Sequence, residues 1–228
     1  MTRERSYGEF RQMTTTITPQ ILLRAYAVGI FPMADDGQDN SLYWVEPEER
    51  GILPLRGFHV PRSLAKKVRK QDFEVRVDSD FDGVIKACAA MSDVRDTTWI
   101  NTRIISLYNQ LHKMGCGHSV ECWQNGELVG GLYGIRIGAA FFGESMFSRQ
   151  TDASKVALVH LVARLKFGGF ALLDAQFTND HLTQFGLEAV SRDDYHLMLE
   201  PALGVDAEFD AFAGDGDADE VLRLARAG

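Results

Sequence analysis

Residues 118–158 contain the pattern that most restricts the fold of this chain: a tight hairpin, a third strand and a helix in direct succession. The segments HSVECWQ and ELVGGLYGI flank Asn125-Gly126, a dipeptide that favours a two-residue hairpin turn. The segment AAFFGES predicts the next strand, and Asp152 or Ser154 can cap a helix over 154–167. Because the glycines at 130, 131, 134, 138 and 143 weaken a strand, we expect something large to lie against this backbone.

The rest of the chain shows helix and strand patterns in mixed order, without a regular βαβ alternation. Helices are expected from Pro19 to Gly29, from near Arg62 to 70, and over 80–90, 102–114, 179–185 and 192–199. Strands are expected around 42–45, 52–54, 73–77, 170–176 and 188–190. This order predicts an α+β or mixed α/β fold, with helices layered on a sheet. We divide the chain into a flexible arm (1–17), an N-terminal lobe (18–70), a larger domain (71–203) and an acidic, mobile tail (204–228).

Composition restricts the class of protein. The chain is 45% hydrophobic and 25% charged, which is typical of a globular protein, and no apolar run approaches membrane-spanning length. The three cysteines form no CxxC pair, so we expect reduced thiols, a cytoplasmic location and no zinc site. The net charge is −8, but residues 201–228 hold seven acidic and two basic residues, a net of −5, which leaves −3 for the other 200 residues. An overall acidic charge therefore does not exclude a nucleic-acid partner, because local patches decide binding.

A basic helix is the first candidate binding element. Its cations lie at i, i+4, i+7 and i+8, which places them on one helical face, and no acidic residue interrupts them. They are Arg62, Lys66, Arg69 and Lys70. The pattern fits either a solvated charged face or a clamp for the phosphates of a nucleic acid.

Polar residues at the ends of two apolar strands are candidates for chemistry. In FALLDAQ, Asp174 and Gln176 are two residues apart and therefore share one strand face. In the corner GESMFSR, Glu144 supplies a second carboxylate beside hydroxyls and aromatic rings. Ser145 lacks the GxSxG context of a nucleophile elbow. Trp99, in TTWI before a polar NTR segment, is placed to stack a base at a cleft. Polar strand ends that only bond to a neighbouring loop remain the structural alternative.

At this point ordered blocks of the sequence resemble a known family. The blocks are AYAVGIFPM (25–33), LYWVEPEERGILP (42–54), HVPRSL (59–64), TTWI (97–100), LHKMGCGHSVECW (111–123), LVGGLYG (128–134), FFGESMFSR (141–149), ASKVAL (153–158), LLDAQ (172–176) and SRDDYHLML (191–199). They cover about residues 18–200 and resemble the leucyl/phenylalanyl-tRNA–protein transferases, the bacterial N-end-rule aminoacyltransferases.

The resemblance implies a GNAT-like acyltransferase domain with a smaller N-terminal α+β lobe. It implies transfer of Leu or Phe, and less efficiently Met, from Leu-tRNA, Phe-tRNA or Met-tRNA to proteins with N-terminal Arg or Lys, without metal or coenzyme, by a monomer that contacts no membrane. The residue roles that it implies are as follows: Asp174, Gln176 and Glu144 at the reaction centre; Leu132, Phe141, Met146 and Leu173 in the acyl pocket; Trp99, Tyr108, Tyr26 and Met33 at the terminal adenosine; and Arg62, Lys66, Arg69 and Lys70 on tRNA.

The sequence departs from the family at two places, and two rival functions stay open. Met33 stands where the family often has Trp after Ile-Phe-Pro, and the acidic C-terminal segment is unfamiliar. A coenzyme-A-dependent acetyltransferase of the same fold should show an R/Q-x-x-G-x-G/A loop after the hairpin, for pyrophosphate, and the sequence has none. A non-catalytic RNA-binding module would explain the basic helix but not the DAQ and GESMFSR segments.

Overall fold

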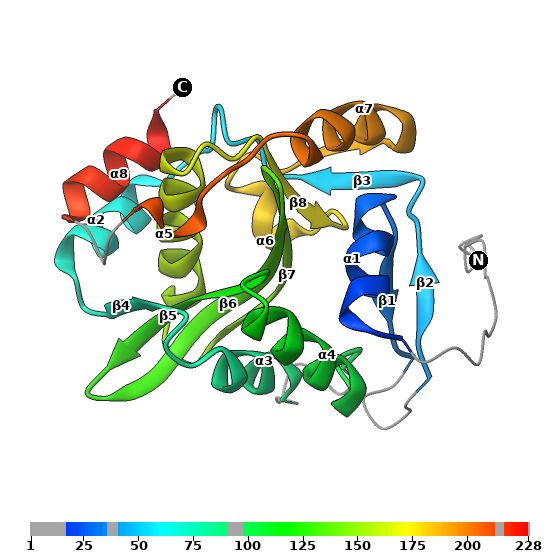
Figure 1. Cartoon of the computed structure of the whole chain (residues 1–228). Coiled ribbons are helices and arrows are strands. Elements are labelled where there is room, and N and C mark those ends of the chain that lie inside the picture. Colours follow the sequence, from blue (N-terminus) through cyan, green and yellow to red (C-terminus); the bar gives the residue numbers. More distant parts are fainter. Residues whose placement is uncertain (1–16, 36–40, 91–97, 213–216, 228) are drawn as a thin grey trace, which may run out of the picture.

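The centre of the molecule is a seven-stranded mixed sheet with helices on both faces (Figure 1). In this computed structural model, residues 17–35, 41–90, 98–212 and 217–227 are described. The sheet order is β4 (Glu74–Val77), β5 (Gly117–Gln124), β6 (Glu127–Ile137), β7 (Ala140–Ser148), β8 (Leu172–Gln176), β3 (Glu49–Ile52) and β9 (Glu188–Ser191). Only the β7–β8 pair is parallel among these strands. Asn125 and Gly126 form the predicted hairpin turn with φ of 53° and 79°. The mixed sheet and its helices confirm the prediction of a mixed α+β fold.

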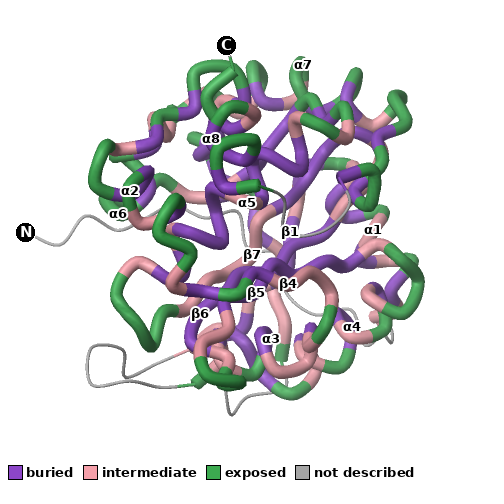
Figure 2. The backbone as a smooth tube through the Cα atoms, turned by 90° about the vertical axis from the view of Figure 1, so that its left-hand side faces the viewer, coloured by how far each residue is buried: buried purple, intermediate pink, exposed green. Residues whose placement is uncertain are grey.

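Alternation along the strands divides the core into two clusters, one on each face of the sheet. Leu132 and Phe141 belong to the α5 face, whereas their neighbours Tyr133 and Phe142 belong to the α4 face. The α5 face is covered by α2 (Arg62–Lys70), α5 (Ala153–Phe167) and α8 (Ala218–Arg226). The α4 face is covered by α1 (Pro19–Ala27), α3 (Phe81–Ala89), α4 (Thr102–Lys113) and α7 (Arg192–Leu203). The central strands are consequently buried on both sides (Figure 2).

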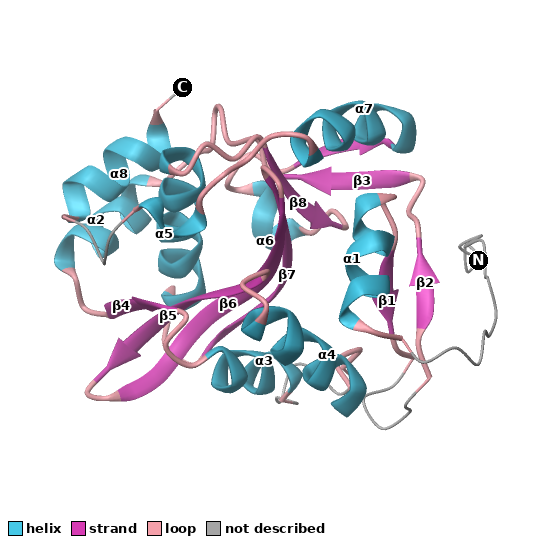
Figure 3. Cartoon of the chain, viewed as in Figure 1, coloured by secondary structure: helices cyan, strands magenta, loops and turns pink. Residues whose placement is uncertain are grey.

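The first part of the chain forms a small N-terminal unit. Thr18 caps α1 by accepting a hydrogen bond from the Ile21 amide, and Pro19 occupies the first helical position. Strands β1 (Phe31–Met33) and β2 (Tyr43–Val45) then pair with each other in a separate two-stranded sheet (Figure 3). Strand β3 and helix α2, which the sequence places in a lobe over 18–70, contribute instead to the large sheet and to the core of its α5 face. The expected arm lies, except for Ile17, outside the described residues.

The glycines of β6 are required by the protein's own packing. A Cβ at Gly130 would collide with Ala153 at the start of α5, and one at Gly134 would collide with the Phe142 carbonyl on β7. The large body expected against this backbone is therefore, at these two positions, helix α5 and the adjacent strand. The glycines allow α5 to pack closely against the strand that lines the cavity described below.

The expectation of a mobile C-terminal tail is corrected by the structure. Residues 209–211 form a 3-10 turn (η1), and α8 buries Val221, Leu222 and Ala225 in the core of the α5 face. The buried Arg164 guanidinium donates hydrogen bonds to the carbonyls of Phe209 and Phe212, at 3.0 and 2.6 Å. The spacing in VLRLARA is amphipathic, and its apolar side is covered here by α5 and α2. Among the described residues, no helix has the length and apolar character that crossing a membrane would need.

Candidate active site

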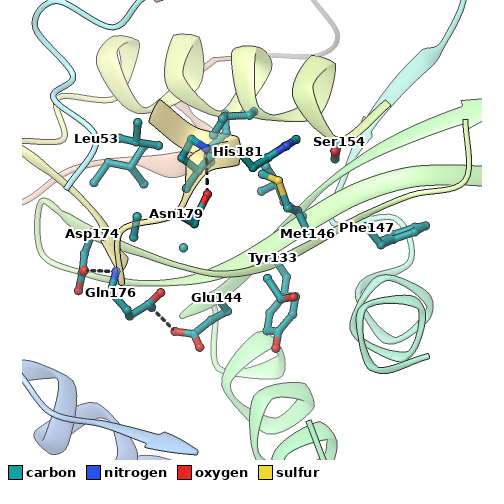
Figure 4. Close-up of a pocket in the computed structure, with 18 of the residues that line it drawn as sticks. Leu53, Tyr133, Glu144, Met146, Phe147, Ser154, Asp174, Gln176, Asn179 and His181 are labelled. Carbon is teal, nitrogen blue, oxygen red and sulfur yellow. Dashed lines mark hydrogen bonds between the residues drawn. The ribbon is translucent and has the colours of Figure 1, made fainter. Parts of the chain in front are cut away.

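A cavity opens where the two parallel strands separate. Strands β7 and β8 pair over residues 140–142 and 172–174, after which β7 continues to Ser148 while β8 ends at Gln176. The cavity has a volume of about 480 Å³ and is lined from β6, β7, β8, α5 and the short helix α6 (Asp180–Thr183). Figure 4 shows helix α5 along one side, and Glu144 of β7 with Asp174 and Gln176 of β8 on the other. The carboxyl ends of parallel strands are a usual place for ligand binding.

One side of the cavity is apolar. Leu132, Met146 and Leu173, three of the four residues expected in an acyl pocket, line it, together with Leu53, Leu158, Leu161 and Leu182. Phe141, the fourth, is fully buried and is not among the lining residues. Its ring stacks on Phe209 of the C-terminal segment, with the ring centres 5.6 Å apart. The placement of Phe141 in the pocket is therefore corrected: the residue supports the cavity wall from behind.

Glu144 provides the carboxylate on the polar side of the cavity. The Tyr26 hydroxyl donates to Oε1 at 2.6 Å, and the Tyr108 hydroxyl donates to Oε2 at 3.1 Å. The Gln176 side-chain amide donates to Oε1 at 3.3 Å. Burial raises the pKa of Glu144 to about 7, although hydrogen bonds from the two tyrosines act in the opposite direction. Glu144 therefore changes charge near neutral pH while it faces the cavity, a property typical of catalytic carboxylates.

Asp174 and Gln176 lie next to each other, as the DAQ spacing predicts, but their side chains have different hydrogen-bond partners. Asp174 is fully buried, and its carboxylate accepts hydrogen bonds from Arg50, Tyr195 and the backbone amide of Gln176. Gln176 has a φ of 57°, and its side chain points to Glu144 (Figure 4). The sequence leaves Asp174 either orienting Gln176 or holding an incoming cationic N-terminus. The geometry favours the orienting role, because both carboxylate oxygens are already engaged.

Sequence reasoning missed Arg50 and Tyr195, the two side chains that hold Asp174. Arg50 lies in β3 and Tyr195 in α7, 124 and 21 residues away from Asp174 along the chain. No local pattern marks them, since an arginine after two glutamates and a tyrosine in a helix are ordinary. The antiparallel pairing of β3 with β8 was the missing information.

The four residues expected at an adenosine site lie in one region, but two of them are not available for stacking. Trp99 and Met33 are partly buried and pack against the core of the α4 face. Tyr26 and Tyr108 have no exposed surface, and their hydroxyls contact each other and Glu144. Burial, followed by the nearby Glu144 charge, raises the pKa of both phenols. Their expected place at the adenosine is therefore corrected to a place behind Glu144.

The basic helix is formed and exposed as predicted, but two of its four cations have acidic partners. Arg69 pairs with Asp219 of α8 at 2.7 Å, and Lys70 pairs with Asp72 at 3.1 Å. Within the described part of the chain, Arg62 and Lys66 are exposed and form no ion pair. Of the four cations, two therefore have no acidic partner among the described residues, one is paired with the C-terminal helix and one is paired with Asp72.

Among the residues that the structure describes, one group of side chains has the composition of a metal site: Asp78, His118 and Asp210. The Asp78 carboxylate already accepts from the Ser119 amide and contacts His118 Nδ1 at 2.7 Å. None of the three lines the cavity. The polar groups that line the cavity are two carboxylates, two side-chain amides, one imidazole and hydroxyls, so the site offers proton transfer and hydrogen bonding.

Comparison with known proteins now decides the family. The model of the family "Leucyl/phenylalanyl-tRNA protein transferase" matches residues 52–200, and that of its N-terminal domain matches residues 15–48. The chain belongs to this family. A leucyl/phenylalanyl-tRNA–protein transferase of Paramagnetospirillum magneticum is 59% identical over 194 residues, which cover 85% of this chain and 93% of that protein. One of Rhodopseudomonas palustris is 60% identical over 199 residues, covering 87% and 89%. Residues 49–51 and 201–228 lie outside both matched family ranges.

Proposed function

We propose that this protein is the N-end-rule aminoacyltransferase that transfers Leu or Phe from tRNA to the α-amine of proteins. The observation that carries the proposal is the cavity between β7 and β8, which joins an apolar wall to a carboxylate and an amide in a chain of this family. Leu, Phe and, less efficiently, Met have apolar side chains that such a wall accepts. The acceptors are proteins with N-terminal Arg or Lys, as the family resemblance implies.

The reaction needs no further activation of the donor, because an aminoacyl ester is already reactive. The α-amine nitrogen attacks the ester carbonyl carbon, a C–N bond forms, and one electron pair moves onto the carbonyl oxygen. The amine gives up a proton, the C–O bond to the tRNA ribose breaks, and the ribose oxygen takes up a proton. Catalysis therefore consists of positioning, proton transfer and stabilisation of the oxyanion.

Glu144 is the residue that we assign as proton acceptor. The described titratable residues that line the cavity are Tyr133, Glu144, Asp174 and His181. Asp174 is fully buried in an ion pair with Arg50, and a phenol is a poor base at neutral pH. His181 lies toward α5, away from Gln176 (Figure 4). Of these four residues, Glu144 alone combines a pKa near 7 with a contact to the Gln176 amide. Gln176 in turn positions the ester or the amine.

A transfer assay tests this function. Labelled Leu-tRNA and Phe-tRNA are incubated with peptides that differ only in an N-terminal Arg, Lys or Ala, without added nucleotide or metal. We expect label on the Arg- and Lys-started peptides. Equal labelling of the Ala-started peptide, or none from either donor, would overturn the proposal. Acetyl-CoA in place of charged tRNA is the control for an acetyltransferase.

The acyl pocket leads to a prediction about selectivity. Leu132→Trp is expected to shrink the cavity and to penalise Phe more than Leu, whereas Leu132→Ala should favour Phe. Each methylene is worth about 1–3 kcal/mol, so the Leu:Phe ratio of kcat/KM should move by roughly tenfold or more, in opposite directions for the two variants. Competition between the two charged tRNAs measures the ratio. Ile135→Val, on the same strand but facing the α4 side, is the matched control and should leave the ratio unchanged. A shift of the same sign in both variants would count against this pocket.

The basic helix leads to a prediction about salt dependence. Lys66→Ala should weaken tRNA binding and flatten the slope of log K against log salt by about 0.9 per lost phosphate contact. Asp219→Asn should strengthen binding and steepen the slope, because it frees Arg69. Filter binding over a salt series checks both, with the exposed Lys113→Ala on α4 as control. A minimal aminoacyl-adenosine donor should react equally well with all variants. Equal losses with both donors would show that the helix is only structural.

Finer parts of the assignment belong to the same proposal. A GNAT-like fold is supported by the mixed sheet with one parallel pair and helices on both faces. A monomeric state, a cytoplasmic location and an adenosine contact at Trp99 remain predictions.

A further inference from the structure

Arg50 is held on every side inside the protein. Its guanidinium donates to both oxygens of Asp174, at 2.9 and 2.6 Å, and to the Gly29 carbonyl at 2.8 Å. The Phe31 and Tyr195 rings lie against it, with their centres 4.7 and 4.4 Å away. Only 2% of the residue is exposed. A charge buried this way is fixed in orientation as well as in position.

The contacts of Arg50 lead through Asp174 to the reaction centre. Asp174 Oδ1, which accepts from Arg50 Nε, also accepts the backbone amide of Gln176 at 2.8 Å. Gln176 makes that bond at a φ of 57°, a left-handed conformation that is uncommon for a non-glycine residue. In this conformation the Gln176 side chain faces Glu144. Four side chains therefore lie in sequence: Arg50, Asp174, Gln176 and Glu144.

Stability alone does not explain this arrangement. A buried ion pair is often no more stabilising than well-packed apolar residues of similar volume, because both charges lose their hydration. A strained backbone held at the end of the pair is an additional cost, and such strain is concentrated at functional sites. An ion pair differs from apolar packing in that its geometry fixes the direction of a hydrogen-bond acceptor, here the Asp174 oxygen beneath the Gln176 amide.

We propose that Arg50 is a positioning residue of the transferase, which holds Asp174 so that Gln176 keeps the conformation in which its amide meets Glu144 and the reacting ester. Arg50 lies between the two matched family ranges, and the assignment rests on the proposed function. Tyr195 holds the other carboxylate oxygen, at 2.7 Å, and supports the same geometry. Through the Gly29 carbonyl, the end of α1 is linked to the same arginine. The small N-terminal unit therefore contacts the same arginine that holds Asp174.

A double-mutant cycle between Arg50 and Gln176 tests this role. Arg50→Lys keeps the charge but loses the two-pronged contact with Asp174. We expect it to lower kcat by about 10- to 100-fold, the size expected for a small misplacement of a reacting group, with less than a twofold change in the KM for tRNA and peptide. In the Gln176→Ala background the same substitution should change kcat by less than about threefold, because the residue that it positions is gone. Equal factors in both backgrounds would overturn the positioning role.

Three further measurements keep the test decisive. Tyr195→Phe removes only one hydroxyl and should show the same dependence on Gln176 with a smaller factor, which covers the case in which Arg50→Lys does not fold. Thermal melts establish that each variant is folded at the assay temperature. The wild-type protein is assayed beside them with the Arg-started peptide. If the wild-type protein transfers Leu but Arg50→Lys lowers kcat by the same factor with and without Gln176, the positioning role fails and the proposed function stands. If the wild-type protein transfers nothing, the proposed function itself fails.

Discussion

Glu144→Gln is expected to lower kcat by about 100- to 10,000-fold for Leu and Phe alike, the usual contribution of a general base. The substitution keeps the shape of the side chain and one of the two oxygens, which accept from Tyr26 and Tyr108 respectively, but it removes the group that accepts the proton. Because both amino acids react through the same ester and amine, the ratio between them should not change. Single-turnover transfer to an Arg-started peptide measures the rate.

Loss of activity in this variant should not come with loss of stability. Burial raises the pKa of Glu144 from 4.5 to about 7, so the folded state prefers the protonated form. The wild-type protein therefore loses stability as pH rises from about 4.5 to 7, and by pH 8 the ionised carboxylate costs about 3 kcal/mol. Glu144→Gln should melt no lower than wild type at pH 8. The exposed Glu127→Gln on β6 is the control and should change neither property. Near-normal kcat in folded Glu144→Gln would refute Glu144 as the base.

Asp174→Ala is expected to destabilise the protein strongly, because it leaves the buried Arg50 charge without its partner. Breaking a buried pair in this way costs about 3–5 kcal/mol. For a chain of this size each kcal/mol lowers Tm by about 2–4 °C, so we expect a decrease of roughly 6–20 °C. Calorimetry or circular dichroism measures it. Rates for this variant are meaningful only well below its own Tm.

The control for this second prediction is Asp72→Ala. Asp72 also forms ion pairs, with Lys67 and Lys70, but they lie at the surface, where such pairs contribute about 0–1 kcal/mol. Its Tm should fall by no more than a few degrees. If Asp174→Ala is no less stable than Asp72→Ala, the Arg50–Asp174 pair does not have the importance that its burial indicates.

Local patterns in the sequence were sufficient for most of the secondary structure. The Asn125-Gly126 turn, the start of the first helix at Pro19 and the spacing of the basic helix are determined by residues a few positions apart, and each is found where it was predicted. The same holds for Asp174 and Gln176, because two residues in a strand share a face. The pairing of strands across the sheet is not local, and that is where the predictions were incomplete.

The missed features all depend on contacts between distant segments. Arg50 reaches Asp174 only because β3 pairs with β8. Tyr26 was expected at the terminal adenosine, but α1 packs it against α4, which buries its ring behind Glu144. The acidic C-terminal segment was expected to be mobile because of its composition, but the apolar face of α8 has a matching surface on α5. Composition indicates how readily a segment is solvated. The burial of Arg50, Tyr26 and α8 depends instead on which distant segment offers a matching surface.

The pH dependence of kcat/KM for an Arg-started peptide, in wild type and in Glu144→Gln, tests the central claim most directly. Two groups must lose a proton for reaction: Glu144, with a pKa of about 7, and the acceptor α-amine, which titrates near 8. In wild type, log kcat/KM should rise with a slope approaching two below about pH 7, a slope of one between about 7 and 8, and level off above. In Glu144→Gln only the amine remains, so the slope should be one throughout the region below about pH 8. A slope of one in both proteins would contradict the account, because proton transfer would then not involve Glu144.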